Sequence, residues 1–222
     1  MTRTQNPNLN NNAKIYLHLN DLPIAILTNL TNTNKCLAID TETMGLNLAR
    51  DRLCLIQLKG ETNEVHLIQF ADIKYDCPNL KTLLNTPDIT KIFHYARFDV
   101  AAINDYLGIL CQNIFCTKIA SKLVRTYTDK HGLKDLCKEL LTIELKKEQQ
   151  SSFWGAEKLT EEQQLYAAND VLYLHNLKTE LEKRLKIENR EGLAKKCFDF
   201  IATQVILDKL GWNDEYNIFA HK

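Results

Sequence analysis

Cys36-Leu-Ala-Ile-Asp40-Thr-Glu42 is an apolar run that ends in two carboxylates, and the turn-forming stretch Thr43-Met-Gly-Leu46 follows it directly. In an extended strand the side chains at i and i+2 project from the same face, so we expect Asp40 and Glu42 side by side. Two like charges this close repel each other unless a cation or a basic side chain neutralises them. Carboxylate oxygens suit Mg²⁺ and Mn²⁺, so the pattern indicates a metal site; the alternative is an ordinary strand end in solvent.

Apolar runs on both sides of this stretch predict the strands of one sheet. Strands are expected at residues 35–40, 53–59, 64–68, 91–94 and 114–116, and a separate short strand at 14–19. The run at 53–59 is almost entirely apolar, which is typical of a central strand that is covered on both faces. The short polar turn that follows it predicts a hairpin with the next strand.

Helical patterns fill most of the remaining chain. They are expected at residues 22–30, 79–84, 97–107, 117–125, 133–141, 160–186 and 191–210. The long helix begins at Thr160, because Thr160-Glu-Glu-Gln163 has the pattern of a capping box. The order of the elements predicts an α/β fold with a mixed five-stranded central sheet flanked by helices. Without a repeat or a linker, residues 1–222 are expected to form a single domain, with a loose N-terminus at 1–13 and a tail at 211–222.

Composition limits the classes of function. The chain has 28 basic and 28 acidic residues, so its formal net charge is zero. A neutral chain is not expected to bind long nucleic acid through contacts to many phosphates. A short anionic substrate remains compatible. The seven cysteines form no CxxC pair and indicate reduced core residues of a cytoplasmic protein. No signal peptide is expected, and no apolar run approaches the about 20 residues of a membrane helix.

Three later positions complete the opening pair of acids. His94-Tyr-Ala-Arg-Phe98-Asp99 places an acid after the strand at 91–94, and Tyr166 and Asp170 lie one turn apart on one face of the late helix. Taken singly, Asp99 is also a candidate helix N-cap, and the Tyr/Asp pair is also compatible with an incidental hydrogen bond. The joint pattern of DxE, FD and YxxxD, in this order, is much more specific.

This combination resembles the DEDDy 3′–5′ exonucleases, the ribonuclease D group on a ribonuclease H-like fold. Within that group the likeness is strongest to the nano-RNase C family of small bacterial oligoribonucleases, and it covers nearly the whole chain after residue 14. The stretches that carry it are residues 40–46, 50–54, 89–94, 115–122, 125–134, 149–152, 166–174 and 211–221.

The resemblance implies that four carboxylates hold two divalent cations, Mg²⁺ or Mn²⁺, per active site. These are Asp40 (the bridging ligand), Glu42, Asp99 and Asp170, and Tyr166 would orient the attacking water. A phenol has an ordinary pKa of about 10 and is a poor base near neutral pH. The resemblance further implies hydrolysis of short oligoribonucleotides, dinucleotides included, from the 3′ end to nucleoside 5′-monophosphates.

Two other functions stay open: a broader ribonuclease D-like RNA or DNA 3′–5′ exonuclease, and a non-catalytic nuclease-fold scaffold that binds nucleic acid. Retention of all four acids and of Tyr166 argues against the scaffold. Only about fifty residues follow Asp170, too few for the extra helical domains of ribonuclease D, which favours short substrates.

The family likeness also suggests residues that touch the substrate. Leu46 matches an apolar residue that wedges against the terminal bases, although a core or turn leucine is the alternative. We expect Thr41, His94 and Phe98 beside the cleft, with a strand-end histidine as the alternative for His94. Lys118, Lys122 and Arg125 share one helix face and are candidates for phosphate contacts, or are simply a solvated face.

Gln150, Ser151 and Trp154 match a patch near the active site in the ribonuclease D group. Phe153 stands where that group often has Asp, which leaves the local polar contact in doubt. The tail is apolar for a chain end and is expected to pack, on its own domain or on another subunit. The resemblance implies a ring-shaped homo-octamer.

Overall fold

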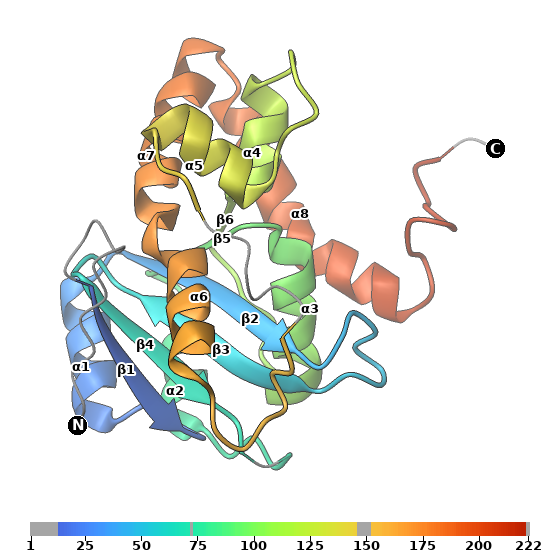
Figure 1. Ribbon diagram of the computed structural model, residues 1–222. Coiled ribbons are helices and arrows are strands. Elements are labelled where there is room, and N and C mark those ends of the chain that lie inside the picture. The colour runs from blue at the N-terminus through green and yellow to red at the C-terminus, as the bar shows by residue number, and fades with distance from the viewer. Residues whose placement is uncertain (1–12, 72, 146–151, 221–222) are drawn as a thin grey trace.

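The computed structural model describes residues 13–71, 73–145 and 152–220, and it contains a six-stranded mixed sheet (Figure 1). The strand order is β1-β4-β3-β2-β5-β6. The strands are β1 (Lys14–Leu19), β2 (Cys36–Thr43), β3 (Leu53–Lys59), β4 (Glu64–Gln69), β5 (Thr90–Phe93) and β6 (Ile114–Cys116). The α/β fold is confirmed. The sheet has one strand more than expected, because β1 joins it in parallel beside β4.

Strand β2 has an antiparallel neighbour and a parallel one. It pairs with β3 in antiparallel and with β5 in parallel orientation, so the strand that carries Asp40 and Glu42 lies inside the sheet. All residues of β3 are buried, as its apolar sequence predicts for a strand covered on both faces.

Eight helices are described, and they surround this sheet. They are α1 (Ile24–Thr33), α2 (Pro78–Asn85), α3 (Ala96–Leu107), α4 (Thr117–Val124), α5 (Leu133–Leu141), α6 (Glu161–Leu172), α7 (Leu174–Ile187) and α8 (Glu191–Lys209). In Figure 1, α6 crosses the face of the sheet that is turned to the viewer, and it packs on β2, β3 and β4. No helix among the described residues has the length and apolar character that crossing a bilayer requires.

The single long helix expected at 160–186 is wrong, because two helices meet at Tyr173. The backbone of Tyr173 (φ −106°, ψ 0°) is not helical, and its N–H bonds to the carbonyl of Val171. The break lets α6 pack on the sheet while α7 packs against α4 and α5. Leu172 in α6 and Leu174 in α7 are both buried next to the break. The two helices bury their apolar residues against different elements, and this explains the bend between them. The capping box at Thr160 is confirmed.

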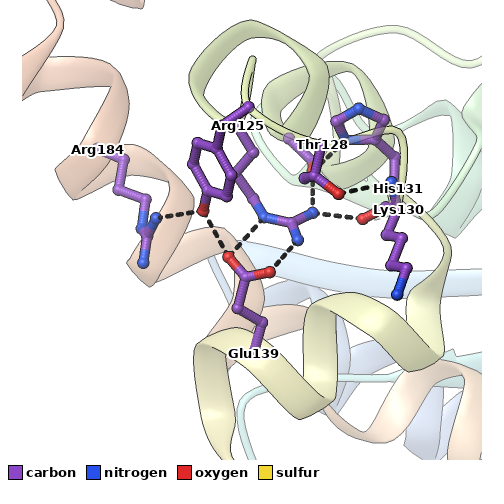
Figure 2. Close-up of polar contacts among 8 residues, drawn as sticks. Arg125, Thr128, Lys130, His131, Glu139 and Arg184 are labelled. Atoms are coloured by element: carbon purple, nitrogen blue, oxygen red, sulfur yellow. Dashed lines mark hydrogen bonds and ion pairs between the residues drawn. The ribbon is translucent and has the colours of Figure 1, made fainter.

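Arg125 does not lie on an exposed basic face, so that expectation is wrong. Its side chain is 0% exposed, and its Nε atom donates to Glu139 Oε1 at 3.0 Å (Figure 2). The Nη2 atom contacts the second oxygen of Glu139, while Nη1 donates to Ser121 Oγ at 3.0 Å and to the carbonyl of Lys130 at 2.6 Å. Each guanidinium nitrogen therefore bonds within the protein, where it fastens the connection between α4 and α5.

Glu139, whose side chain is 40% exposed, is the acidic partner of buried Arg125. Hydrogen bonds from Arg125 and then from Tyr127 lower the pKa of Glu139 from 4.5 to about 2. Because the folded-state pKa lies below the unfolded value, the contribution to stability is present above pH 4.5 and is lost as the pH falls towards about 2.

We predict that Glu139→Gln lowers the free energy of unfolding at neutral pH by about 1 kcal/mol, because the buried guanidinium of Arg125 loses a charged partner that solvent partly screens. Urea denaturation at neutral pH and at about pH 2.5 measures this, and the difference from the wild type should shrink in acid. Glu144→Gln, which breaks an exposed pair with Lys138, is the control with little effect. An equal loss of stability at both pH values would contradict the interpretation.

Candidate active site

Three acids meet where α6 crosses the end of β2. Asp40 and Glu42 come from β2 and Asp170 comes from α6, and one carboxylate oxygen from each lies within 4.8 Å of the others. All three residues are half-buried. The side-by-side placement of Asp40 and Glu42 that strand alternation predicts is therefore present, and the acid of the late helix joins them.

Asp99 lies next to this group in the first turn of α3. It is buried, and its Oδ1 atom accepts a hydrogen bond from Thr41 Oγ1 at 2.7 Å. The residue that precedes α3 is Tyr95, so Asp99 is not the N-cap of this helix. Asp40 contributes to raising the pKa of Asp99, which places the fourth acid close enough to interact with the cluster. Thr41 thus orients an acid, and its own side chain is buried.

Burial and mutual repulsion disfavour the charged forms of these acids. Burial raises the pKa of Asp40 to about 7. Burial first, and then the charges of Asp40, Asp170 and Asp99, raise the pKa of Glu42 to about 10. The pKa values of Asp99 and Asp170 also rise well above the ordinary value, through burial and then through Asp40. Bound protons or a cation can relieve such repulsion, and an all-carboxylate set suits Mg²⁺ or Mn²⁺.

Tyr166 lies one helical turn before Asp170 and is half-buried. Burial, followed by the charges of Asp170, Glu42 and Asp40, raises the pKa of its phenol above the ordinary value. The hydroxyl therefore keeps its proton and can donate a hydrogen bond, while it is unsuited to act as a base. The indole of Trp154 lies 6.1 Å from the Tyr166 ring between centroids, and Trp154 is itself buried, so it supports the tyrosine from within the fold.

The other predicted substrate residues differ in exposure. Leu46 is 87% exposed in the turn after β2, so it is not a core leucine, while the alternative of a turn leucine stays open. His94 Nδ1 lies 2.9 Å from Thr117 Oγ1, and burial, with a smaller effect of Lys118, lowers the pKa of His94 to about 3. Phe98 is half-buried in the first turn of α3.

The patch expected around residue 150 is only partly visible. Gln150 and Ser151 lie outside the described residues. Phe153 is exposed, and its carbonyl and the hydroxyl of Ser152 both accept hydrogen bonds from Gln163 Nε2, at 3.3 and 2.8 Å. The capping box of α6 therefore also holds the chain on which Trp154 lies.

Two residues beside the site were missed in the sequence. Gln57 Nε2 lies 3.4 Å from Asp40 Oδ2, and the signal for it is a lone neutral polar residue within an apolar strand. Tyr95 precedes α3 in a left-handed conformation (φ 70°, ψ 46°), which is uncommon for a bulky residue, and its exposed ring lies 4.1 Å below Lys118 Nζ. No sequence signal marks Tyr95, since Gly, Asn and Asp are the usual residues at such positions.

The match to the 3′-5′ exonuclease family extends over residues 19–186, most of the chain. The chain therefore belongs to this family, and the order of its acids and of Tyr166 is that of the DEDDy type. It is similar to Brucella melitensis NrnC in two solved structures. The structure bound to pGG has 49% identity and a TM-score of 0.88, covering 95% of this chain and 100% of that one. The structure with bound Mg²⁺ has 49% identity and a TM-score of 0.86, covering 94% and 99%.

Among curated proteins, the chain is also similar to ribonuclease D of Gluconacetobacter diazotrophicus. The identity is 33% over 153 residues, which is 69% of this chain and 38% of that protein. The chain thus spans well under half the length of this relative.

We predict that the metal-free protein loses stability as the pH rises. Because their pKa values are raised, Asp40 and Glu42 keep their protons in the folded protein at a pH where the unfolded chain, with ordinary pKa values of about 4, has released them. The free energy of unfolding therefore falls as the pH rises from about 5 to about 9. Glu42→Gln should raise the Tm in EDTA near pH 8 by about 2–8 °C, since Gln is neutral at any pH, whereas Glu42 must bind a proton on folding at this pH.

Calorimetry in EDTA across this pH range measures the effect, with Asp76→Asn, an exposed acid, as the control. Metal-free wild type whose stability increases steadily up to pH 9 would contradict the repulsion.

Proposed function

We propose that this chain is a metal-dependent 3′–5′ exoribonuclease that hydrolyses short oligoribonucleotides, dinucleotides included, to nucleoside 5′-monophosphates. The observation that carries the proposal is the convergence of Asp40, Glu42 and Asp170 within 4.8 Å, with Asp99 held nearby by Thr41. The similarity to a protein solved with pGG, and in a second structure with Mg²⁺, supports the same assignment.

The acids are the groups that would hold the cations. Asp40, Glu42 and Asp170 would hold one divalent ion, and Asp40 with Asp99 a second, either Mg²⁺ or Mn²⁺. When bound, such ions supply acidity to a water and neutralise charge on the scissile phosphate. Thr41 donates a hydrogen bond to Asp99 Oδ1 and so restricts the orientation of this carboxylate.

Residues around the acids would bind and orient the substrate. The protonated hydroxyl of Tyr166 donates a hydrogen bond that orients the attacking water. Leu46, exposed in the turn after β2, wedges against the terminal bases. Neutral His94 and the half-buried ring of Phe98 contact the sugar or base. Gln150 and Trp154 are proposed as further substrate contacts.

Short substrates are favoured by the charge and by the similar structure. The formal net charge of zero offers little electrostatic attraction for a long polyanion. The similarity to the NrnC structure bound to pGG, which is covered over 100% of its length, supports a short substrate. The broader exonuclease and the non-catalytic scaffold are the alternatives that the experiments below distinguish.

The C-terminal tail supports a proposal of self-association. It leaves the body of the molecule after α8 (Figure 1) and exposes Trp212, Tyr216, Ile218 and Phe219. One aromatic contact, between Phe200 and Phe219 at 5.7 Å between ring centroids, joins the tail to its own helix α8. Exposed apolar side chains in this number favour burial by another subunit, and we propose a homo-octamer.

We predict that the protein with Mn²⁺ or Mg²⁺ degrades a 5′-labelled RNA dinucleotide much faster than an RNA of about 20 nucleotides. A length series between these limits, with a DNA series beside it, measures the ratio of kcat/KM. Asp99→Asn should lower kcat by at least about a hundredfold while the circular dichroism spectrum is unchanged, because an acid of the cation site is lost.

An intact dinucleotide beside a trimmed 20-mer would contradict the preference for short substrates and favour the broader exonuclease. Binding of nucleic acid without cleavage of a substrate of any length would favour the scaffold.

We predict that light scattering finds a mass near that of eight protomers of 25.6 kDa each. The double variant Ile218→Ser and Phe219→Ser should reduce this mass, since it removes exposed apolar surface from the tail. Leu193→Ser, an exposed leucine at the opposite end of α8, is the control. A wild-type protein that elutes and scatters as a monomer would contradict the octamer.

A further inference from the structure

Gln57 is a fully buried polar residue on β3, a strand that is otherwise apolar from Leu53 to Leu58. In the antiparallel register of β2 and β3, Gln57 lies directly opposite Asp40. Opposed residues of an antiparallel pair project from the same face of the sheet. The amide of Gln57 therefore shares a face with Asp40 and Glu42, beneath α6.

The two ends of this amide have different partners. Gln57 Nε2 donates to Asp40 Oδ2 at 3.4 Å, a long hydrogen bond. Gln57 Oε1 is buried and has no hydrogen-bond partner among the residues that the structure describes. The opposite amide orientation would place an acceptor against an ionised carboxylate, so donation to Asp40 is the arrangement that suits the charged acid.

A second glutamine shows what a structural role looks like on the same face. Gln69 on β4 is two residues beyond Leu67, which pairs with Gln57, so both glutamine side chains project from one face. Gln69 Nε2 donates to the carbonyls of Ala156 and Glu157, at 2.8 and 3.3 Å, and ties the segment before α6 to the sheet. Gln69 joins two parts of the backbone, whereas the one side-chain hydrogen bond of Gln57 to a described residue goes to an acid of the cluster.

An unpaired buried amide oxygen destabilises a fold, and an apolar side chain of similar volume would avoid this penalty. Buried Leu55 on β3 and Leu67 on β4 share this face with Gln57, so an apolar side chain there would have apolar neighbours. Its amide therefore opposes stability in the metal-free protein, and its benefit must lie in its one hydrogen-bond partner, Asp40.

We propose that Gln57 is a positioning residue: its Nε2 hydrogen bond holds the Asp40 carboxylate in the orientation that converges with Glu42 and Asp170. Groups that bond to metal-binding carboxylates fix their orientation and raise the affinity of the site. The inference rests on the proposed function, because it assumes that this cluster holds a divalent cation.

The test compares Gln57→Met, of similar volume and without a donor, with the matched control Gln69→Met. Calorimetric titration with Mn²⁺ gives the affinity, thermal unfolding in EDTA gives the stability, and dinucleotide hydrolysis gives kcat and KM. For Gln57→Met we expect an unchanged or higher Tm in EDTA, a Kd for Mn²⁺ raised about tenfold or more, and a lower kcat with little change in KM. For Gln69→Met we expect a lower Tm and an unchanged Kd for Mn²⁺.

A second variant, Gln57→Leu, guards against a packing effect specific to methionine and should show the same opposed changes. The proposal is overturned if both Gln57 variants lower the Tm in EDTA as Gln69→Met does while their Kd for Mn²⁺ stays within about twofold of the wild type. Failure of the proposed function is distinguishable, because the wild-type protein would then itself bind no Mn²⁺ and cleave no dinucleotide.

Discussion

Electrostatic repulsion among acids at the end of β2 is the constraint on which the site depends. Asp40, Glu42 and Asp170 have oxygens within 4.8 Å of one another, and burial together with neighbouring charge raises the pKa of Glu42 to about 10. Groups that repel each other stay close only if the surrounding packing holds them there. The buried sheet and α6 supply that packing, so the fold holds the acids in a mutual repulsion that a divalent cation would relieve.

The two elements of the cluster are held by ordinary apolar packing. The acids of β2 are placed by a sheet whose neighbouring strand β3 is wholly buried, and Asp170 is placed by α6, which packs on β2, β3 and β4. The break at Tyr173 lets α6 and α7 run in different directions, so α6 packs on the sheet while α7 packs against α4 and α5. Away from the acids, buried Arg125 and its exposed partner Glu139 secure the α4–α5 connection.

Local sequence predicted the parts of this arrangement that depend on short-range geometry. Strand alternation placed Asp40 beside Glu42, and helical spacing placed Tyr166 one turn from Asp170, because both periods are properties of the backbone itself. The capping box at Thr160 is likewise a local hydrogen-bond pattern and is present. Arg125 was misjudged, because helical spacing shows which residues share a face and not whether other elements cover that face.

The sequence by itself therefore determined the α/β class, the identity of the acids and the order in which they occur. Only the tertiary structure decided that Asp99 is held by Thr41, that Arg125 is buried and that Gln57 lies against Asp40. These contacts join residues of different elements, and their distances depend on strand register and helix packing. Register and packing are set by burial over the whole domain, which no local pattern encodes.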